Sequence, residues 1–101
     1  MIVAAPEYAH GVPGALKNAL DWLVGDETFT GKPTMLINVA PRAFHAQAQL
    51  REVLATMAAR IVPKASVIVG LAGLDTADAV AADARVASRL REGLEGLLAA
   101  L

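Results

Sequence analysis

Residues 6–14 carry the residue types best suited to hold a ligand. They include two prolines and two glycines within nine residues, so the backbone there is stiff and tightly turned. Such a loop can present main-chain N–H and C=O groups to a flat heterocycle, while Tyr8 or His10 offers an aromatic surface. A helix predicted to begin at Pro13 adds the positive end of a helix dipole, which favours electron-rich oxygen atoms. We therefore interpret this stretch as a ligand-binding loop.

The remaining reactive side chains do not form a recognisable catalytic set. His10 and His45 are single histidines with no partner carboxylate at ligand spacing, which argues against a metal site. Ser66 and Ser88 lack the sequence context of a nucleophile elbow, so a hydrolase triad is not credible. The chain has no cysteine, which excludes a disulfide scaffold, a thiolate metal site and a cysteine nucleophile. We expect neither a metal nor a catalytic side chain.

Three short apolar runs predict strands, and they alternate with helical patterns. The strands are expected at Met1–Ala5, Thr34–Ala40 and Ala65–Val69. Continuous apolar runs of this kind are typical of strands covered on both faces. The sequence therefore predicts an α/β fold whose parallel strands are joined by right-handed crossovers.

Apolar residues at helical spacing predict three helices. The first begins at Pro13 and stops near Gly25, with Trp22 placed in the core or at a subunit interface. The last begins between Ala77 and Asp83, and either Asp78 or Asp83 is its N-cap. The expected buried stripes are Leu16, Ala19, Leu20 and Leu23 in the first helix, Leu50, Val53, Leu54, Met57 and Ile61 in the second, and Ala87, Leu90, Leu94, Leu97 and Leu101 in the last.

The predicted sheet has one functional edge and one open edge. Ligands of open α/β sheets bind beyond the carboxyl ends of the strands, where the loops 6–12, 41–45 and 70–78 would lie. Three strands make a small sheet, and an uncovered edge beside Met1–Ala5 would invite pairing with another strand. On physical grounds we expect something to lie beside this strand.

Composition limits the class of protein further. The chain has 101 residues, of which 55% are hydrophobic and 19% charged, which indicates a single core-rich domain. Its formal net charge is −1 and no basic stripe stands out, so nucleic-acid binding has no electrostatic support. No apolar run is long enough to span a membrane, and the N-terminus does not have the pattern of a signal peptide. We therefore expect a cytoplasmic protein.

The run from Pro6 to Trp22 resembles the Pro-Glu-Tyr-Asn…Pro-Gly-x-Leu-Lys-Asn-Ala-x-Asp-Trp block of NADPH-dependent FMN reductases. The segment Thr28–Pro33 is similar to the Phe-x-Gly-Lys-Pro lead into the next strand of that family, and residues 46–51 resemble its following helix. The similarity spans essentially the whole chain. It implies that residues 1–101 form the C-terminal portion of a flavodoxin-like domain. This portion would be a three-layer α/β structure with a parallel sheet, truncated to about three strands and three helices.

The resemblance also implies an activity, which is NAD(P)H-dependent reduction through bound FMN of a quinone, an azo compound or free flavin. It implies FMN and NADPH as cofactors, a small-molecule electron acceptor as partner and a homo-oligomer. The loop would hold the isoalloxazine ring largely through main-chain groups, with the turn at residues 41–42 on the other side of the ring. By position, the cofactor-binding residues would be Pro6, Glu7, Tyr8, Ala9, His10, Gly11, Pro41 and Arg42.

Three departures from the family pattern bear on function. Ala9 stands where the family usually has asparagine, and residues 41–45 (Pro-Arg-Ala-Phe-His) replace a glycine-rich stretch. No segment matches the family's first strand and its Ser/Arg-rich loop, which grips the FMN phosphate. Two alternatives to an active reductase therefore stay open. The chain is either an inactive truncated fragment or a non-enzymatic interaction module that completes its sheet with another chain.

Overall fold

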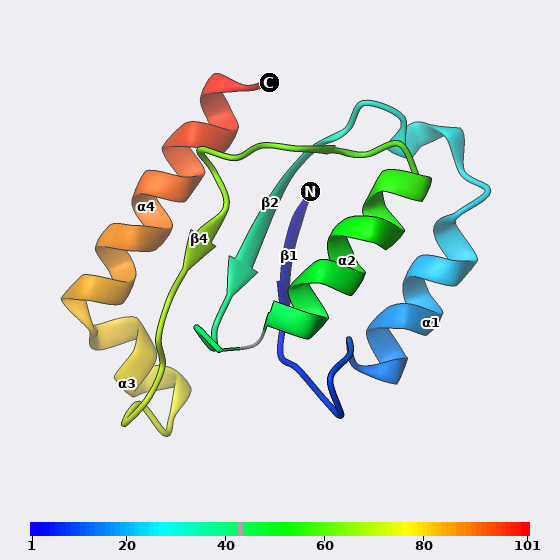
Figure 1. The fold of residues 1–101 in the computed structure, drawn as a ribbon. Coiled ribbons are helices and arrows are strands. Elements are labelled where there is room, and N and C mark those ends of the chain that lie inside the picture. Colours follow the sequence, from blue (N-terminus) through cyan, green and yellow to red (C-terminus); the bar gives the residue numbers. More distant parts are fainter. Residues whose placement is uncertain (43) are drawn as a thin grey trace.

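The computed structural model describes residues 1–42 and 44–101, and it shows a parallel sheet between two layers of helices (Figure 1). The strands are β1 (Ile2–Ala5), β2 (Pro33–Asn38), β3 (Arg60–Ile61) and β4 (Val67–Ile68). The central strand β2 pairs in parallel with each of the other three. This arrangement confirms the predicted α/β class and the parallel sheet.

Two short strands, β3 and β4, lie along the same side of β2, and the predicted strand 65–69 corresponds to β4 alone. Thr34 is in register with Ile61 of β3, and Ile37 is in register with Val67 of β4. The chain turns outward between them, where Pro63 has no N–H to give to a strand ladder. In this gap the backbone N–H of Leu36 donates to the Ser66 hydroxyl at 3.3 Å instead of to a strand carbonyl. Strand 65–69 is therefore shorter than predicted.

Each face of the sheet is covered by one pair of helices. Helices α1 (Gly14–Leu23) and α2 (Phe44–Thr56) lie on one face, and α3 (Ala77–Ala82) and α4 (Ala84–Ala99) lie on the other (Figure 1). A 3₁₀ turn, η1 (Glu27–Phe29), follows α1. Side chains alternate between the two faces, as expected in strands. One core contains Val3, Leu36, Leu50 and Leu54, and the other contains Met35, Val67, Val86 and Leu97.

The helix boundaries correct the sequence prediction in two places. Helix α2 ends at Thr56, and Ile61 lies in β3 rather than on the buried stripe of the helix. The last helix is two helices, because Asp83 has extended backbone angles and its carboxylate accepts from Val86 N at 2.9 Å. Asp83 is therefore the N-cap of α4 as predicted. Asp78 is not a cap, since Thr76 caps α3.

Several apolar residues of the predicted buried stripes lie at the surface, among them Ala19 and Leu23 of the first helix. Trp22 was expected in the core or at a subunit interface; it is 83% exposed, so the core position is wrong and the interface stays a prediction. Leu94 and Leu101 are also exposed, at 43% and 79%. On α4 the buried position next to Leu94 is Gly93, where the helix approaches the sheet too closely for a side chain.

One edge of the sheet is open, as the sequence predicted. In the described part of the chain, β1 pairs with β2 on one side and with no strand on the other. Val3 and Ala5 are buried beneath α1 and α2, whereas Ile2 and Ala4 point to the opposite face and are exposed. The helices α3 and α4 therefore leave the outer strand partly bare on their side.

Candidate functional site

The carboxyl ends of the strands meet at one edge of the sheet, at the bottom of Figure 1. The loop after β1, the turn after β2 and the loop after β4 all lie at this edge. In the turn after β2, Ala43 lies outside the described residues, while Pro41 and Arg42 are exposed. This edge is where a parallel α/β sheet offers its binding site.

The loop after β1 is a tight two-residue turn. Tyr8 N donates to Gly11 O and Gly11 N donates to Tyr8 O, each at 2.9 Å. Between them Ala9 has φ 48° and His10 has φ 61°, so two residues that are not glycine occupy the left-handed region. Turns with positive φ at both central positions normally hold asparagine, aspartate or glycine. Backbone strain of this kind clusters at functional sites.

This geometry leaves two main-chain donors open. Among the described residues, no acceptor bonds to the N–H of Ala9 or of His10. Tyr8 lies beside them with 65% of its surface exposed, and His10 is exposed as well. The turn therefore has two N–H groups without an acceptor among the described residues, beside exposed aromatic surface.

Two side chains fasten the loop to the start of α2. The Glu7 carboxylate accepts from Ala46 N at 2.7 Å, and so satisfies one of the unpaired N–H groups of that helix end. The side-chain amide oxygen of Gln49 accepts from Val12 N at 2.8 Å. A Cβ atom added at Gly11 would lie 2.8 Å from the same Gln49 oxygen, so only glycine fits there without displacing Gln49. Glu7 thus faces inward toward α2.

The loop after β1 also contacts the start of α2 through two histidines. The rings of His10 and His45 stack with centroids 4.2 Å apart and planes 22° from parallel, and Phe44 packs beside His45 at 4.4 Å. No group of three or more metal-ligating side chains occurs among the described residues. The stacked pair therefore serves as a contact between the loop after β1 and the start of α2.

A hollow of about 350 Å³ lies between the turn after β2 and the loop after β4. Pro41 and Arg42 line it from one side, and Gly70, Leu71 and Ala72 line it from the other. The residues that line it are mostly apolar, and Arg42 is the charged one among them. A hollow of this size and character suits one ring system of a small ligand.

The eight predicted site residues all lie at this edge, in two groups. One group is the turn from Pro6 to Gly11, and the other is the pair Pro41 and Arg42. Sequence reasoning missed Gln49 and the stacking partner His45. Gln49 lies 37 residues from the backbone N–H that it accepts from, and no local pattern in the sequence signals such a contact.

Comparison with known proteins decides the family. The profile of the family described as NADPH-dependent FMN reductase matches residues 1–73, which include β1 to β4 and the eight predicted site residues. The chain belongs to this family. The flavodoxin-like fold predicted from the sequence is therefore confirmed, and residues 74–101, with α3 and α4, lie outside the matched span.

Curated relatives of this FMN reductase family member are reductases. The chain is 36% identical over 76 residues to the NADH:(hydroxy)cinnamate reductase subunit CrdA of Vibrio ruber, covering 69% of this chain and 38% of the relative. It is 33% identical over 80 residues to NADH-dependent flavin reductase subunit 2 of Lactobacillus johnsonii, covering 69% and 44%. A quinone reductase of Escherichia coli is 45% identical over 38 residues, covering 36% and 20%. The chain thus spans less than half the length of each.

The helices α1 to α4 are short or charged. None of the helices in residues 1–42 and 44–101 has the length and apolar character that crossing a bilayer requires.

Proposed function

We propose that this chain takes part in NAD(P)H-dependent reduction of a small acceptor, such as a quinone, an azo compound or free flavin, through FMN held at the carboxyl edge of the sheet. The observation that carries the proposal is the turn at Ala9 and His10, whose two open N–H groups are fixed by left-handed backbone angles. Family membership supports a flavin-dependent reductase, and the relatives named above support an NADH- or NADPH-linked one.

The residues present fit the ring half of FMN. The N–H groups of Ala9 and His10 would donate to electron-rich atoms at the edge of the isoalloxazine, and Tyr8 would offer its ring as a flat apolar surface. Pro6 and Gly11 would hold the turn in place, and Glu7 would act through its bond to α2. Pro41 and Arg42 would close the site from the turn after β2, with Arg42 attracting an anionic group of the dinucleotide.

The chemistry belongs to the cofactor, which when bound accepts a hydride from NAD(P)H and passes electrons to the acceptor. The protein therefore needs no acid, base or nucleophile of its own. Its part is to orient the ring, to present main-chain dipoles to it and to leave one face open to both substrates in turn. A protein that only binds and orients the cofactor agrees with a site built of main-chain groups and exposed aromatic rings.

Titration with two flavins tests the proposal. FMN and riboflavin are added separately to the purified chain, while flavin fluorescence and the absorption band at about 450 nm are recorded. The residues named here would contact the isoalloxazine ring, which FMN and riboflavin share. We therefore expect both flavins to bind with affinities within about tenfold of each other. Bound FMN should bleach on addition of NADPH. Absence of any saturable change with either flavin would exclude the proposal for this chain.

A second candidate is an interaction module that completes its sheet with another chain. The open edge of β1 favours it, because an unpaired strand edge offers a row of backbone donors and acceptors. Two of the relatives are named as subunits. A colourless chain that sediments only as an assembly would support this candidate, and a colourless monomer would support an inactive fragment.

The other expectations stay predictions. We propose that residues 1–101 form the C-terminal portion of a flavodoxin-like reductase domain, that the protein self-associates and that it works in the cytoplasm. Sedimentation velocity of the purified chain and fractionation of the cells that make it would test the last two.

A further inference from the structure

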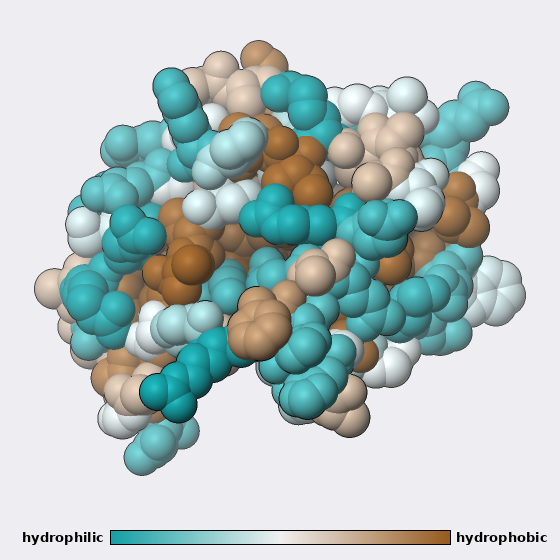
Figure 2. All heavy atoms as spheres, in the orientation of Figure 1, coloured by the Kyte–Doolittle hydropathy of each residue, from teal (hydrophilic) through white to brown (hydrophobic). Residues whose placement is uncertain are grey.

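The loop after β4 forms one wall of the hollow of about 350 Å³ at the carboxyl edge of the sheet. Gly70, Leu71 and Ala72 belong to this wall, and the turn after β2 supplies the opposite one. Figure 2 shows apolar atoms at the surface over the region where β4 runs, bordered by hydrophilic side chains. A ligand in the hollow would lie mostly against apolar residues, so a small number of polar groups would fix its orientation.

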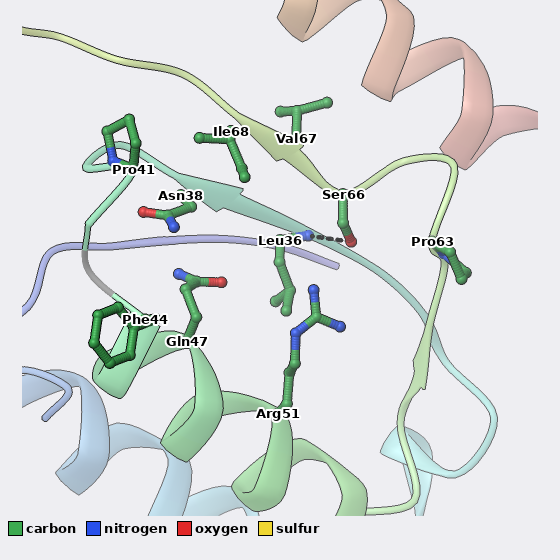
Figure 3. Close-up of a pocket in the computed structure, with 10 residues that line it drawn as sticks. All are labelled: Leu36, Asn38, Pro41, Phe44, Gln47, Arg51, Pro63, Ser66, Val67 and Ile68. Carbon is green, nitrogen blue, oxygen red and sulfur yellow. Dashed lines mark hydrogen bonds between the residues drawn. The ribbon is translucent and has the colours of Figure 1, made fainter.

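Pro41 borders two depressions. It lines both the hollow and a groove of about 360 Å³ between α2 and β4, and it lies near the carboxyl ends of these two neighbouring strands, β2 and β4 (Figure 3). A Cβ atom added at Gly70 would lie 3.8 Å from Cγ of Pro41, which is an ordinary van der Waals distance. The two walls of the hollow thus come close at Pro41 and Gly70, and the shape of the hollow depends on how Gly70 is held.

The carbonyl group of Gly70 is held from α4. Nη2 of Arg85 donates to Gly70 O at 2.7 Å, and no main-chain donor bonds to this oxygen among residues 1–42 and 44–101. Arg85 does not line the hollow, so the carbonyl is directed to a side chain outside it. The bond therefore joins the wall of the hollow to a helix that lies beyond the span matched by the family profile.

Local electrostatics do not favour Arg85 at its place in α4. Asp83 is the N-cap, so Arg85 is the second residue of the helix, where the positive end of the helix dipole disfavours a cation. In the part of the chain that the structure describes, no carboxylate lies within ion-pair distance of its guanidinium. The hydrogen bond to Gly70 O is therefore what gives this charge a partner.

The same bond fixes the direction of a main-chain donor. The peptide between Gly70 and Leu71 is trans and planar, so its C=O and N–H point to opposite sides. Because Gly70 O is directed to Arg85, the N–H of Leu71 points away from that side chain. Leu71 lines the hollow, and no acceptor among the described residues bonds to its N–H. Gly70 has no side chain to restrict this peptide, so Arg85 is what holds its orientation.

We propose that Arg85 is a positioning residue of the hollow. By holding Gly70 O, it directs Leu71 N–H toward the hollow as a donor for the ring carbonyl of an electron acceptor. One neutral donor among mostly apolar residues matches a single uncharged acceptor atom on a flat ring. The inference rests on the proposed function for the identity of the ligand as an electron acceptor.

Two small probes test the donor. 1-Indanone carries a ring carbonyl, and indane has the same fused rings without the oxygen atom. Each probe is titrated into the ¹⁵N-labelled chain, and the backbone amide signals of Leu71 and Ala72 are followed by NMR. We expect saturable shifts with 1-indanone and about fivefold weaker binding of indane, because one neutral hydrogen bond is lost.

Variants of α4 assign the effect to Arg85. Arg85→Met removes the donor together with an unfavourably placed cation, so the protein should stay folded while the preference for 1-indanone disappears. Hydrogen exchange at Leu71 should also speed up. Arg85→Lys keeps a charged donor and should retain part of the preference. Arg91→Met, at an exposed position of the same helix, should leave the preference unchanged.

Three outcomes would overturn the inference. They are equal affinity for 1-indanone and indane, a preference that survives Arg85→Met, and displacement of 1-indanone by riboflavin, which would assign the hollow to the flavin ring. The flavin titration separates this inference from the proposed function. A chain that binds no flavin but keeps the Arg85-dependent preference would contradict the proposed function alone, and flavin binding without that preference would contradict this inference alone.

Discussion

At the scale of single residues, the turn after β1 is held in a conformation that its sequence does not favour. Ala9 has φ 48° and His10 has φ 61°, and left-handed backbone costs about 1–2 kcal/mol for a residue with a Cβ atom. Asparagine, which the family usually carries at the first of these positions, tolerates the region better because its side chain bonds locally. The departure at Ala9 therefore removes conformational support as well as an amide.

Restoring that support is the first prediction. Ala9→Asn should raise the free energy of unfolding by about 0.5–1 kcal/mol and tighten flavin binding, because the turn is better preorganised. Urea unfolding and the flavin titration measure the two effects. Ala81→Asn, at an exposed position inside α3, should be destabilising instead. An unchanged or lower stability of Ala9→Asn would show that the turn is not under strain.

Gly11 gives a second prediction at this scale. In Gly11→Ala the new Cβ would lie 2.8 Å from Gln49 Oε1, so that side chain must move and release Val12 N–H. We expect a loss of about 1–2 kcal/mol in chemical unfolding and weaker flavin binding. Gly14→Ala is the matched control, since nothing lies within 4 Å of its Cβ and alanine suits a helix. Equal behaviour of the two variants would contradict the proposed role of Gln49.

At the scale of elements, the loop after β1 and helix α2 are coupled through Glu7. Glu7→Ala removes the acceptor of Ala46 N–H, and the loss of such a helix-capping bond costs about 1 kcal/mol. Glu52→Ala, at an exposed position of α2, should change stability by less than about 0.5 kcal/mol. Hydrogen exchange at Ala46 should speed up in Glu7→Ala alone. If it does not, the loop and the helix are not coupled through this carboxylate.

Helix α4 approaches the sheet at Gly93. A Cβ atom there would lie 2.7 Å from the carbonyl oxygen of Ala65 and 2.5 Å from the end of the Met35 side chain. Gly93→Ala should therefore lower the thermal midpoint and cost about 1–3 kcal/mol, more than the roughly 1 kcal/mol that alanine gains in helix propensity. Ser88→Ala, at an exposed position of the same helix, should be neutral or slightly stabilising. A stabilising Gly93→Ala would show that α4 can move outward freely.

At the scale of the whole molecule, the bare face of β1 is the surface through which we expect the protein to self-associate. Ile2 is 50% exposed on an edge strand that carries no charged residue. Ile2→Lys should shift sedimentation velocity toward the monomer and leave the unfolding midpoint within a few degrees. Ala55→Lys, at an exposed position of α2, should not change the distribution. Identical profiles for the wild type and Ile2→Lys would exclude this face from self-association.

The sequence by itself determined the α/β order, the parallel sheet, the edge that carries the loops and the position of the predicted site. Apolar runs ended by proline and glycine, together with the block from Pro6 to Trp22, are local signals and can be read without knowing what packs where. The same local reading narrowed the N-cap of the last helix to Asp78 or Asp83, and the structure decided for Asp83.

Only the tertiary structure decided the features that depend on contacts between distant residues. Four features each depend on an element far away in the chain. They are the short strand at residues 60–61, the inward role of Glu7, the Gln49 contact and the exposure of Trp22. Periodicity shows which face of a helix is apolar, but not whether a partner covers that face. For the same reason the groove between α2 and β4 had no signature in the sequence, since residues of β2, α2 and β4 build it together.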